Sequence, residues 1–380
     1  MTIIYDGDYP MATGAVFWDR DLTLPIEEIR AAPDEYHNRE GDTADESGGV
    51  DTKLMACLPE MRKGGIAAAT VKICVCVRKA PDWHGEVRSK ENAYAMAKGQ
   101  LAYYRILEAQ GEARILDNKS DFSDHLEEWL TTNDYSSLPV GFVIGMEGAD
   151  AITWPEQVHE WYDLGLRVIS LSHYGVSYYS HGTGTGTDGG LTDLGKPLLK
   201  EMDSLGMILD VSHTSDQSVR EELEVFGGPV LASHQNCRAI VPGERQQPDE
   251  ILKEIINRDG VIGASMDTFM LNRDYEIDWA NTGAIPRRAI FPREAITLND
   301  LVDHMDHVNQ LAGDSRHSSI GGDTDGQGGT DGAPADVDTV SDYQIVGEIL
   351  ADRGYGQDDI DNMLYGNWQR FFEKWLPTKI

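Results

Sequence analysis

The sequence contains no long apolar run and few basic residues, and each shortage excludes a class of protein. No stretch approaches the ~18 consecutive apolar residues of a membrane span, and the amino terminus lacks the basic-then-apolar layout of a secretory signal. We therefore expect a cytoplasmic protein with no membrane partner. Only 32 basic residues accompany 65 acidic ones, for a net charge of −33, which argues against nucleic acid and anionic lipid as partners.

Cysteine is also scarce. Four cysteines in 380 residues provide no disulfide framework. Cys74 and Cys76 lie on the same face of one predicted strand, but a zinc site there would need two more soft ligands nearby. We interpret these two side chains as core packing.

Eight short apolar runs predict strands, and most of them end on a histidine or a carboxylate. Helical patterns occupy most of the intervals, for example residues 91–109, 155–164 and 297–311. Strand followed by helix, eight times, is the sequence form of a TIM (β/α)8 barrel, an α/β fold that accommodates this length as a single domain of residues 1–380. The predicted strands are residues 3–8, 66–77, 140–150, 167–173, 207–213, 229–234, 261–267 and 319–323.

Three long connections follow the fourth, seventh and eighth predicted strands, at residues 181–190, 268–293 and 324–339. In a barrel, these connections lie at the carboxyl ends of the strands, where loops build the substrate pocket. Long loops at this face predict a covered site.

The carboxyl ends of barrel strands share one mouth, so residues distant in sequence should converge there. Glu147, His213 and His234 are the ligand types of a catalytic zinc: two imidazoles and a carboxylate, with a fourth position open for water. His173 and Asp323 end two further strands at the same mouth. Because zinc lowers the pKa of its bound water toward ~7, this pattern predicts hydrolysis.

Short motifs spread over almost the whole chain support the same interpretation. They are Met-Arg-Lys-Gly-Gly at 61–65, Gly-Met-Glu-Gly at 145–148, Leu-Ser-His at 171–173, Met-Ile-Leu-Asp-Val-Ser-His at 207–213, Ala-Ser-His at 232–234, Arg-Gln-Gln-Pro-Asp at 245–249, Ile-Gly-Gly-Asp-Thr-Asp-Gly at 320–326 and Gly-Asn-Trp-Gln-Arg at 366–370. In this order the chain resembles the membrane (renal) dipeptidase family of zinc metallopeptidases, a branch of the amidohydrolase barrels.

The resemblance implies hydrolysis of dipeptides, some with a D-residue at the carboxyl side, by two zinc ions that a glutamate and a hydroxide bridge. It also implies a preference for homodimers. By motif, Glu147 resembles the bridging carboxylate, His213 and His234 the imidazole ligands of one metal, His173 the group that steadies the oxyanion, Arg245 the clamp on the substrate carboxylate, and Asp323 the group that takes and passes the proton of the attacking water.

The first strand departs from the family pattern. The family has Asp-Gly-His-x-Asp, whose His and Asp hold the second metal, whereas this chain has Asp-Gly-Asp-Tyr-Pro at residues 6–10. Pro10 offers no ligand, and Asp8 replaces an imidazole. We therefore expect one firm zinc site and a second site that is weak, empty or filled by a harder ion such as magnesium.

The sequence thus predicts a metal-dependent, dipeptidase-like hydrolase acting on a dipeptide or similar small amide with a free carboxylate. The alternative is a catalytically impaired or one-metal relative that binds a small ligand or hydrolyses a different amide, because Asp8 and Pro10 alter the first metal motif. The sequence leaves open the side chains and stereochemistry of the substrate, the number and identity of the metals, and the oligomeric state.

Overall fold

The computed structural model describes residues 1–380 apart from 32–53, 79–86, 185–188, 279–286, 326–328 and 380. The three long connections predicted at the barrel mouth each include one of these gaps. Residues 185–188, 279–286 and 326–328 of those connections therefore lie outside the described part of the chain.

All eight predicted strands are present, and every strand pair is parallel, which confirms the α/β class. A ninth, short strand, β3, was not predicted; it pairs with β4 along only three residues. The strands of the described chain are β1 (Ile4–Tyr9), β2 (Ile66–Cys74), β3 (Ala113–Ile115), β4 (Val140–Glu147), β5 (Leu166–Ser170), β6 (Ile208–Asp210), β7 (Val230–Leu231), β8 (Ile262–Ala264) and β9 (Ser318–Ile320).

The sheet curls as a barrel does, but continuous strand pairing does not close it. Seven strands form one sheet in the order β1-β2-β4-β5-β6-β7, with β3 beside β4, and β8 pairs with β9 in a second sheet. One bridge, Ala232 to Ile262, joins the two sheets. Within the described residues no ladder joins β9 to β1. Instead the Asp323 N–H donates to the Asp8 carbonyl at 3.1 Å, and the Gly322 N–H donates to Asp6 Oδ1 at 2.7 Å. The Asp6 carboxylate thus accepts the N–H of Gly322, which in a closed ladder would donate to a backbone carbonyl of β1.

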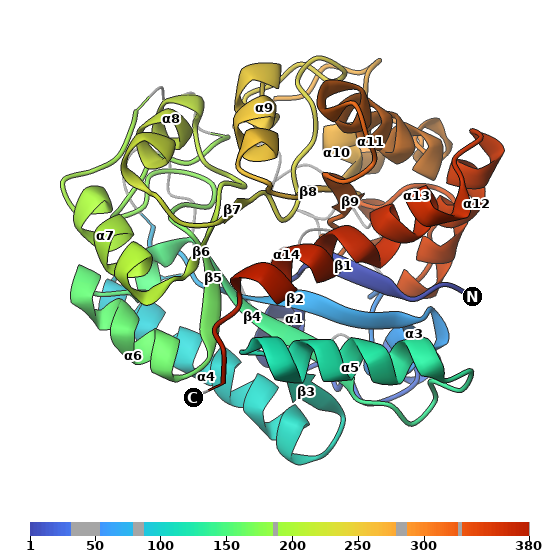
Figure 1. Ribbon diagram of the computed structural model, residues 1–380, viewed down its shortest axis with the longest axis horizontal. Coiled ribbons are helices and arrows are strands. Elements are labelled where there is room, and N and C mark those ends of the chain that lie inside the picture. The colour runs from blue at the N-terminus through green and yellow to red at the C-terminus, as the bar shows by residue number, and fades with distance from the viewer. Residues whose placement is uncertain (32–53, 79–86, 185–188, 279–286, 326–328, 380) are drawn as a thin grey trace.

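Helices surround the curled sheet (Figure 1). Several begin at a side-chain cap, as at Ser89, Asn118 and Ser215, where the side chain accepts a backbone N–H of the first turn. The α-helices are α1 (Met11–Trp18), α2 (Ile26–Ala31), α3 (Leu58–Lys63), α4 (Lys90–Ala109), α5 (Lys119–Thr131), α6 (Val158–Asp163), α7 (Gly195–Leu205), α8 (Asp216–Val225), α9 (Asp249–Asn257), α10 (Thr268–Leu271), α11 (Leu298–Ala312), α12 (Gln344–Asp352), α13 (Gln357–Asp361) and α14 (Asn367–Trp375).

The core lies on both faces of the sheet. Every residue of β2 and β4 is buried, as expected for central parallel strands covered on both faces. The carboxyl-terminal helix α14 packs against β1, with the rings of Trp368 and Phe372 centred 5.8 and 5.3 Å from that of Tyr5. None of the helices in the described chain combines the length and the apolar character needed to cross a bilayer.

Candidate metal centre

The predicted site residues lie at corresponding positions of neighbouring strands. Glu147 is the last residue of β4, while His173, His213, His234 and Asp323 each lie three residues beyond the ends of β5, β6, β7 and β9. The carboxyl ends of parallel strands meet at one edge, so the fold brings these side chains together. The pocket at this edge is lined by Pro10, Thr13, Cys74, Glu147, His173, Tyr174, His213, Arg245, Asp267, Met270 and Asp323.

Glu147 lies between two histidines. Its Oε1 is 3.2 Å from His213 Nε2 and 3.3 Å from His234 Nε2. On the other side of its ring, His234 Nδ1 lies 3.0 Å from Asp8 Oδ2, to which it donates, so Nε2 is the nitrogen left to bind an ion when the ring is neutral. Within the described chain neither Glu147 Oε1 nor His234 Nε2 has a hydrogen-bond partner, and both are buried. Two buried polar atoms without a partner, one of them on a carboxylate, are ligand atoms that a cation between them would satisfy.

The donor atoms fit a metal ion. Two of the groups with metal-ligand geometry are Asp8, Glu147 and His234, and Glu147, His173 and His213; within each, the ligand atoms lie within 4.8 Å of one another. Glu147 belongs to both groups. Imidazole nitrogens and carboxylate oxygens in this combination suit zinc.

One carboxylate oxygen of Asp8, Oδ2, already has three partners within the protein. This oxygen lies 2.8 Å from Lys72 Nζ, accepts a hydrogen bond from Ser233 Oγ at 2.9 Å, and accepts from His234. Lys72 also pairs with Asp210 Oδ2 at 2.7 Å, and Lys72, Asp8 and Asp210 are all fully buried. An ammonium group therefore lies beside the carboxylate that the sequence offered as a second-metal ligand. Of the two carboxylate oxygens of Asp8, it is Oδ1 that has no hydrogen-bond partner in the described structure.

Burial and neighbouring charge shift the pKa values of the centre in opposite directions. Burial raises the pKa of Glu147. Electrostatic interactions with the groups around it lower the pKa by more, so that it lies at about 2; these groups are His173, His234, Lys72 and Arg245. Glu147 is therefore a carboxylate at neutral pH.

Burial shifts the pKa values of two other groups of the centre toward the neutral form, and neighbouring carboxylates raise the pKa of a third. Burial lowers the pKa of His173 to about 4 and raises that of Asp323 well above its ordinary value. For His234, burial lowers the pKa, but Asp8 and Asp323 raise it more, to about 9. His173 is thus a neutral imidazole at pH 7 that can still donate one N–H.

Two of the site residues have strained backbones. His213 and Asp323 adopt φ values of 62° and 57°, in the left-handed region that side chains other than Gly, Asn and Asp rarely occupy. Such strain costs on the order of 1–3 kcal/mol and persists where the surrounding structure enforces it, commonly at functional sites.

Arg245 places a guanidinium group in the pocket wall without a carboxylate partner. It is buried and contacts His213 Nε2 at 3.1 Å, Gln235 Oε1 at 3.0 Å and the His234 carbonyl at 3.2 Å. No ion pair to Arg245 occurs among the described residues. A buried cation in this state favours an anionic ligand.

Lys72 and Asp210 were not predicted as part of the site, although their positions in the sequence could have indicated them. Each is a charged residue inside an apolar run that was correctly predicted as a strand. A charge in a strand buried on both faces requires a partner, so two such strands predict an ion pair between them.

The fold and the centre together define a class: curled parallel α/β proteins with a buried imidazole–carboxylate centre at the carboxyl ends of the strands. Within this class, the chain belongs to the membrane dipeptidase family, peptidase family M19, which it matches over residues 36–376. This confirms the family that the motifs predicted.

Individual relatives carry dipeptidase names. Dipeptidase verJ of Clonostachys rogersoniana is 30% identical over 250 residues, covering 64% of this chain and 58% of that protein. Dipeptidase 3 of Rattus norvegicus is 28% identical over 247 residues, covering 63% and 46%. An uncharacterized dipeptidase of Schizosaccharomyces pombe is 28% identical over 224 residues, covering 58% and 50%. The chain thus spans about half the length of the relatives it matches.

Solved structures share the fold over nearly the whole chain. A metallo peptidase from Rhodobacter sphaeroides, liganded with a phosphinate mimic of the dipeptide L-Ala-D-Ala, superposes with a TM-score of 0.73 at 20% identity, covering 99% of this chain and 100% of that one. The probable dipeptidase PvdM from Pseudomonas aeruginosa gives 0.74 at 18% identity, covering 98% and 95%. At these identities the likeness concerns the fold.

Proposed function

We propose that the chain is a metal-dependent hydrolase that cleaves the amide bond of a dipeptide or of a similar small substrate with a free carboxylate. The observation that carries the proposal is the pair of buried atoms, Glu147 Oε1 and His234 Nε2, that lie 3.3 Å apart and have no hydrogen-bond partner in the described chain. Membership of the dipeptidase family supports it, as does the dipeptide mimic bound to the Rhodobacter sphaeroides relative.

Glu147, His213 and His234 would hold a zinc ion, with Asp8 fixing the tautomer of His234 through Oδ2. A bound zinc ion supplies Lewis-acid chemistry, which polarises a carbonyl group and makes a water molecule acidic near neutral pH. Asp8 would contribute a ligand only through Oδ1, and Lys72 already places a positive charge beside it. We therefore expect one firm site and a second that is weak or absent.

The remaining side chains would act directly on the substrate. Arg245, which has no carboxylate partner in the described chain, would bind the free carboxylate of the substrate through its guanidinium fork. His173 lines the same pocket and would donate its N–H to the carbonyl oxygen as negative charge develops there. Asp323 would accept the proton of the attacking water and pass it to the leaving amine.

The proposal is tested by measuring metal content and turnover of L-L and L-D dipeptides in the same preparations. His213→Ala and His234→Ala should each lose both the metal and the activity, because each removes a ligand. His159→Ala is the matched control, since His159 lies on the surface, where it pairs with Glu201. Full activity in either ligand variant would overturn the assignment. A wild-type protein without metal or cleavage would instead support the alternative of a barrel that binds a small ligand.

The single-domain organisation of residues 1–380, the cytoplasmic location, the identity of the metal as zinc and the preference for homodimers remain predictions from the sequence.

A further inference from the structure

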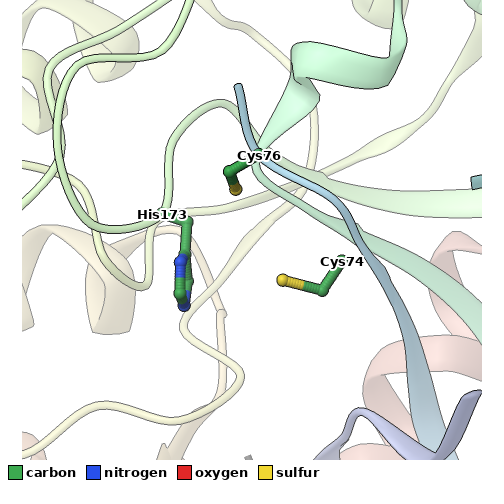
Figure 2. A group of neighbouring side chains, drawn as sticks. All are labelled: Cys74, Cys76 and His173. Atoms are coloured by element: carbon green, nitrogen blue, oxygen red, sulfur yellow. The ribbon is translucent and has the colours of Figure 1, made fainter. Parts of the chain in front are cut away.

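A second set of candidate metal-binding atoms lies beside Glu147, where Cys76 Sγ is 3.9 Å from the Glu147 carbonyl oxygen. Cys74 is the last residue of β2, and Cys76 follows it two positions later along the chain. His173 comes from the loop after β5, and the three side chains converge (Figure 2). Their ligand atoms all lie within 4.8 Å of one another.

Neighbouring contacts keep this geometry in place. Gln100 on α4 binds the backbone of Cys74 on both sides, accepting its N–H at 2.9 Å and donating to its carbonyl at 3.0 Å. Cys74 is paired in register with Glu147 on β4. Gly148, at a φ of 76°, leaves the space that Cys76 uses, because a Cβ there would lie 2.8 Å from the Cys76 sulfur.

The group can be reached by an ion. Cys74 and His173 both line the pocket at the strand ends. Two thiolates and one imidazole form a soft donor set, which selects zinc, cadmium or copper(I) over magnesium or calcium. The centre around Glu147, by contrast, has no sulfur in its donor groups.

We propose that Cys74, Cys76 and His173 form a binding site for a soft d10 cation beside the imidazole–carboxylate centre, with which it shares His173. A divalent ion binds as two thiolates, so both thiols release their protons to solvent, and the open fourth position faces the pocket. No oxidation or reduction is involved.

The site has a consequence for the pocket. His173 cannot ligate an ion here and donate to a substrate oxygen at the same time. Donation to a substrate oxygen rests on the proposed function, whereas binding of the soft cation does not. A filled soft site would therefore hold the enzyme in a form without its oxyanion donor.

Cadmium tests the proposal, because sulfur-to-cadmium charge transfer absorbs in the ultraviolet and reports thiolate ligands alone. The reference protein carries Cys57→Ser and Cys237→Ser, so that only the two relevant thiols remain; both replaced cysteines are buried and belong to none of the three metal-ligand groups of the described chain. Titrating Cd²⁺ should give a charge-transfer band that saturates at one ion per chain, with release of two protons. Adding Cys76→Ser should abolish the saturating band, and His173→Gln should weaken binding by at least about 10-fold.

Two outcomes would overturn the proposal. The first is the absence of a saturating band both in the reference protein and in the wild-type protein, which carries no substitution. The second is an unchanged band in the Cys76→Ser variant, with Cys76→Ala repeating the measurement should the serine disturb packing. Neither outcome depends on dipeptide cleavage, so failure here is distinguishable from failure of the proposed function.

Discussion

Replacing Lys72 with methionine tests the ion pair that the fold buries beneath the candidate centre. The methionine keeps most of the volume of the lysine side chain but removes the ammonium group. Asp8 and Asp210, both fully buried, would then face each other across Ser233 without the ammonium counter-charge that they share.

The expected loss follows from the distances. At 2.7 and 2.8 Å, and with an effective dielectric constant of about 20, each Lys72–carboxylate pair contributes about 6 kcal/mol of Coulomb attraction. The cost of desolvating the three charges offsets much of this gain. Removing one partner of a buried pair nevertheless costs about 3–5 kcal/mol, because the remaining charge stays buried without compensation. We expect Lys72→Met to lower the free energy of unfolding by that amount.

Urea unfolding at pH 7 in the presence of a chelator measures this loss without a contribution from bound metal. Lys63→Met is the control. Lys63 pairs with Glu60 at 3.1 Å, but its side chain is 65% exposed, so its loss should cost less than about 1 kcal/mol. Combining Lys72→Met with Asp210→Asn should recover about 1–3 kcal/mol, since one of the two uncompensated charges is removed. A Lys72→Met variant as stable as the Lys63 control would refute the idea that this pair is a major interaction of the core.

The remaining predictions concern catalysis and pH. Arg245→Lys should raise KM by about 10–100-fold, because a charge-assisted hydrogen bond contributes about 1.5–3 kcal/mol; an unchanged KM would remove Arg245 from substrate binding. Asp323→Asn should lower kcat by about 10²–10⁴-fold while metal content stays at the wild-type value, and loss of the metal would make Asp323 a ligand instead. Burial and the nearby Arg114 lower the pKa of His125 to about 4. The unfolded chain binds this proton below about pH 6.5, so the stability due to the neutral ring is present above pH 6.5 and is lost as the pH falls toward 4. The loss should reach about 2 kcal/mol at pH 5 in urea unfolding relative to His125→Gln, and an identical pH dependence in both proteins would contradict it.

Local sequence was sufficient to locate the strands and the chemistry at their ends. An apolar run that stops at a histidine or a carboxylate is a local pattern, and parallel strands place all such stops at one edge. Glu147, His213 and His234 were therefore predicted to lie together before any contact was known, and the structure places them so. β3 was missed because its residues, Ala-Arg-Ile, do not lie in a long apolar run, whereas the equally short β6 and β7 do.

Only the tertiary structure decided which partners the charged and soft side chains obtain. Lys72 pairs with Asp210, 138 positions away along the chain. His173, in the loop after β5, lies close to Cys74 and Cys76 at the end of β2. Those cysteines were predicted to pack in the core, because the sequence near them offers no further soft ligand. Strand order and register fix such meetings, and both depend on how the whole sheet curls and packs. The sequence by itself thus determined the family, the strands and the metal-binding residue types. The neighbours of Asp8, and the unclosed gap between β9 and β1, followed from long-range packing that no local pattern encodes.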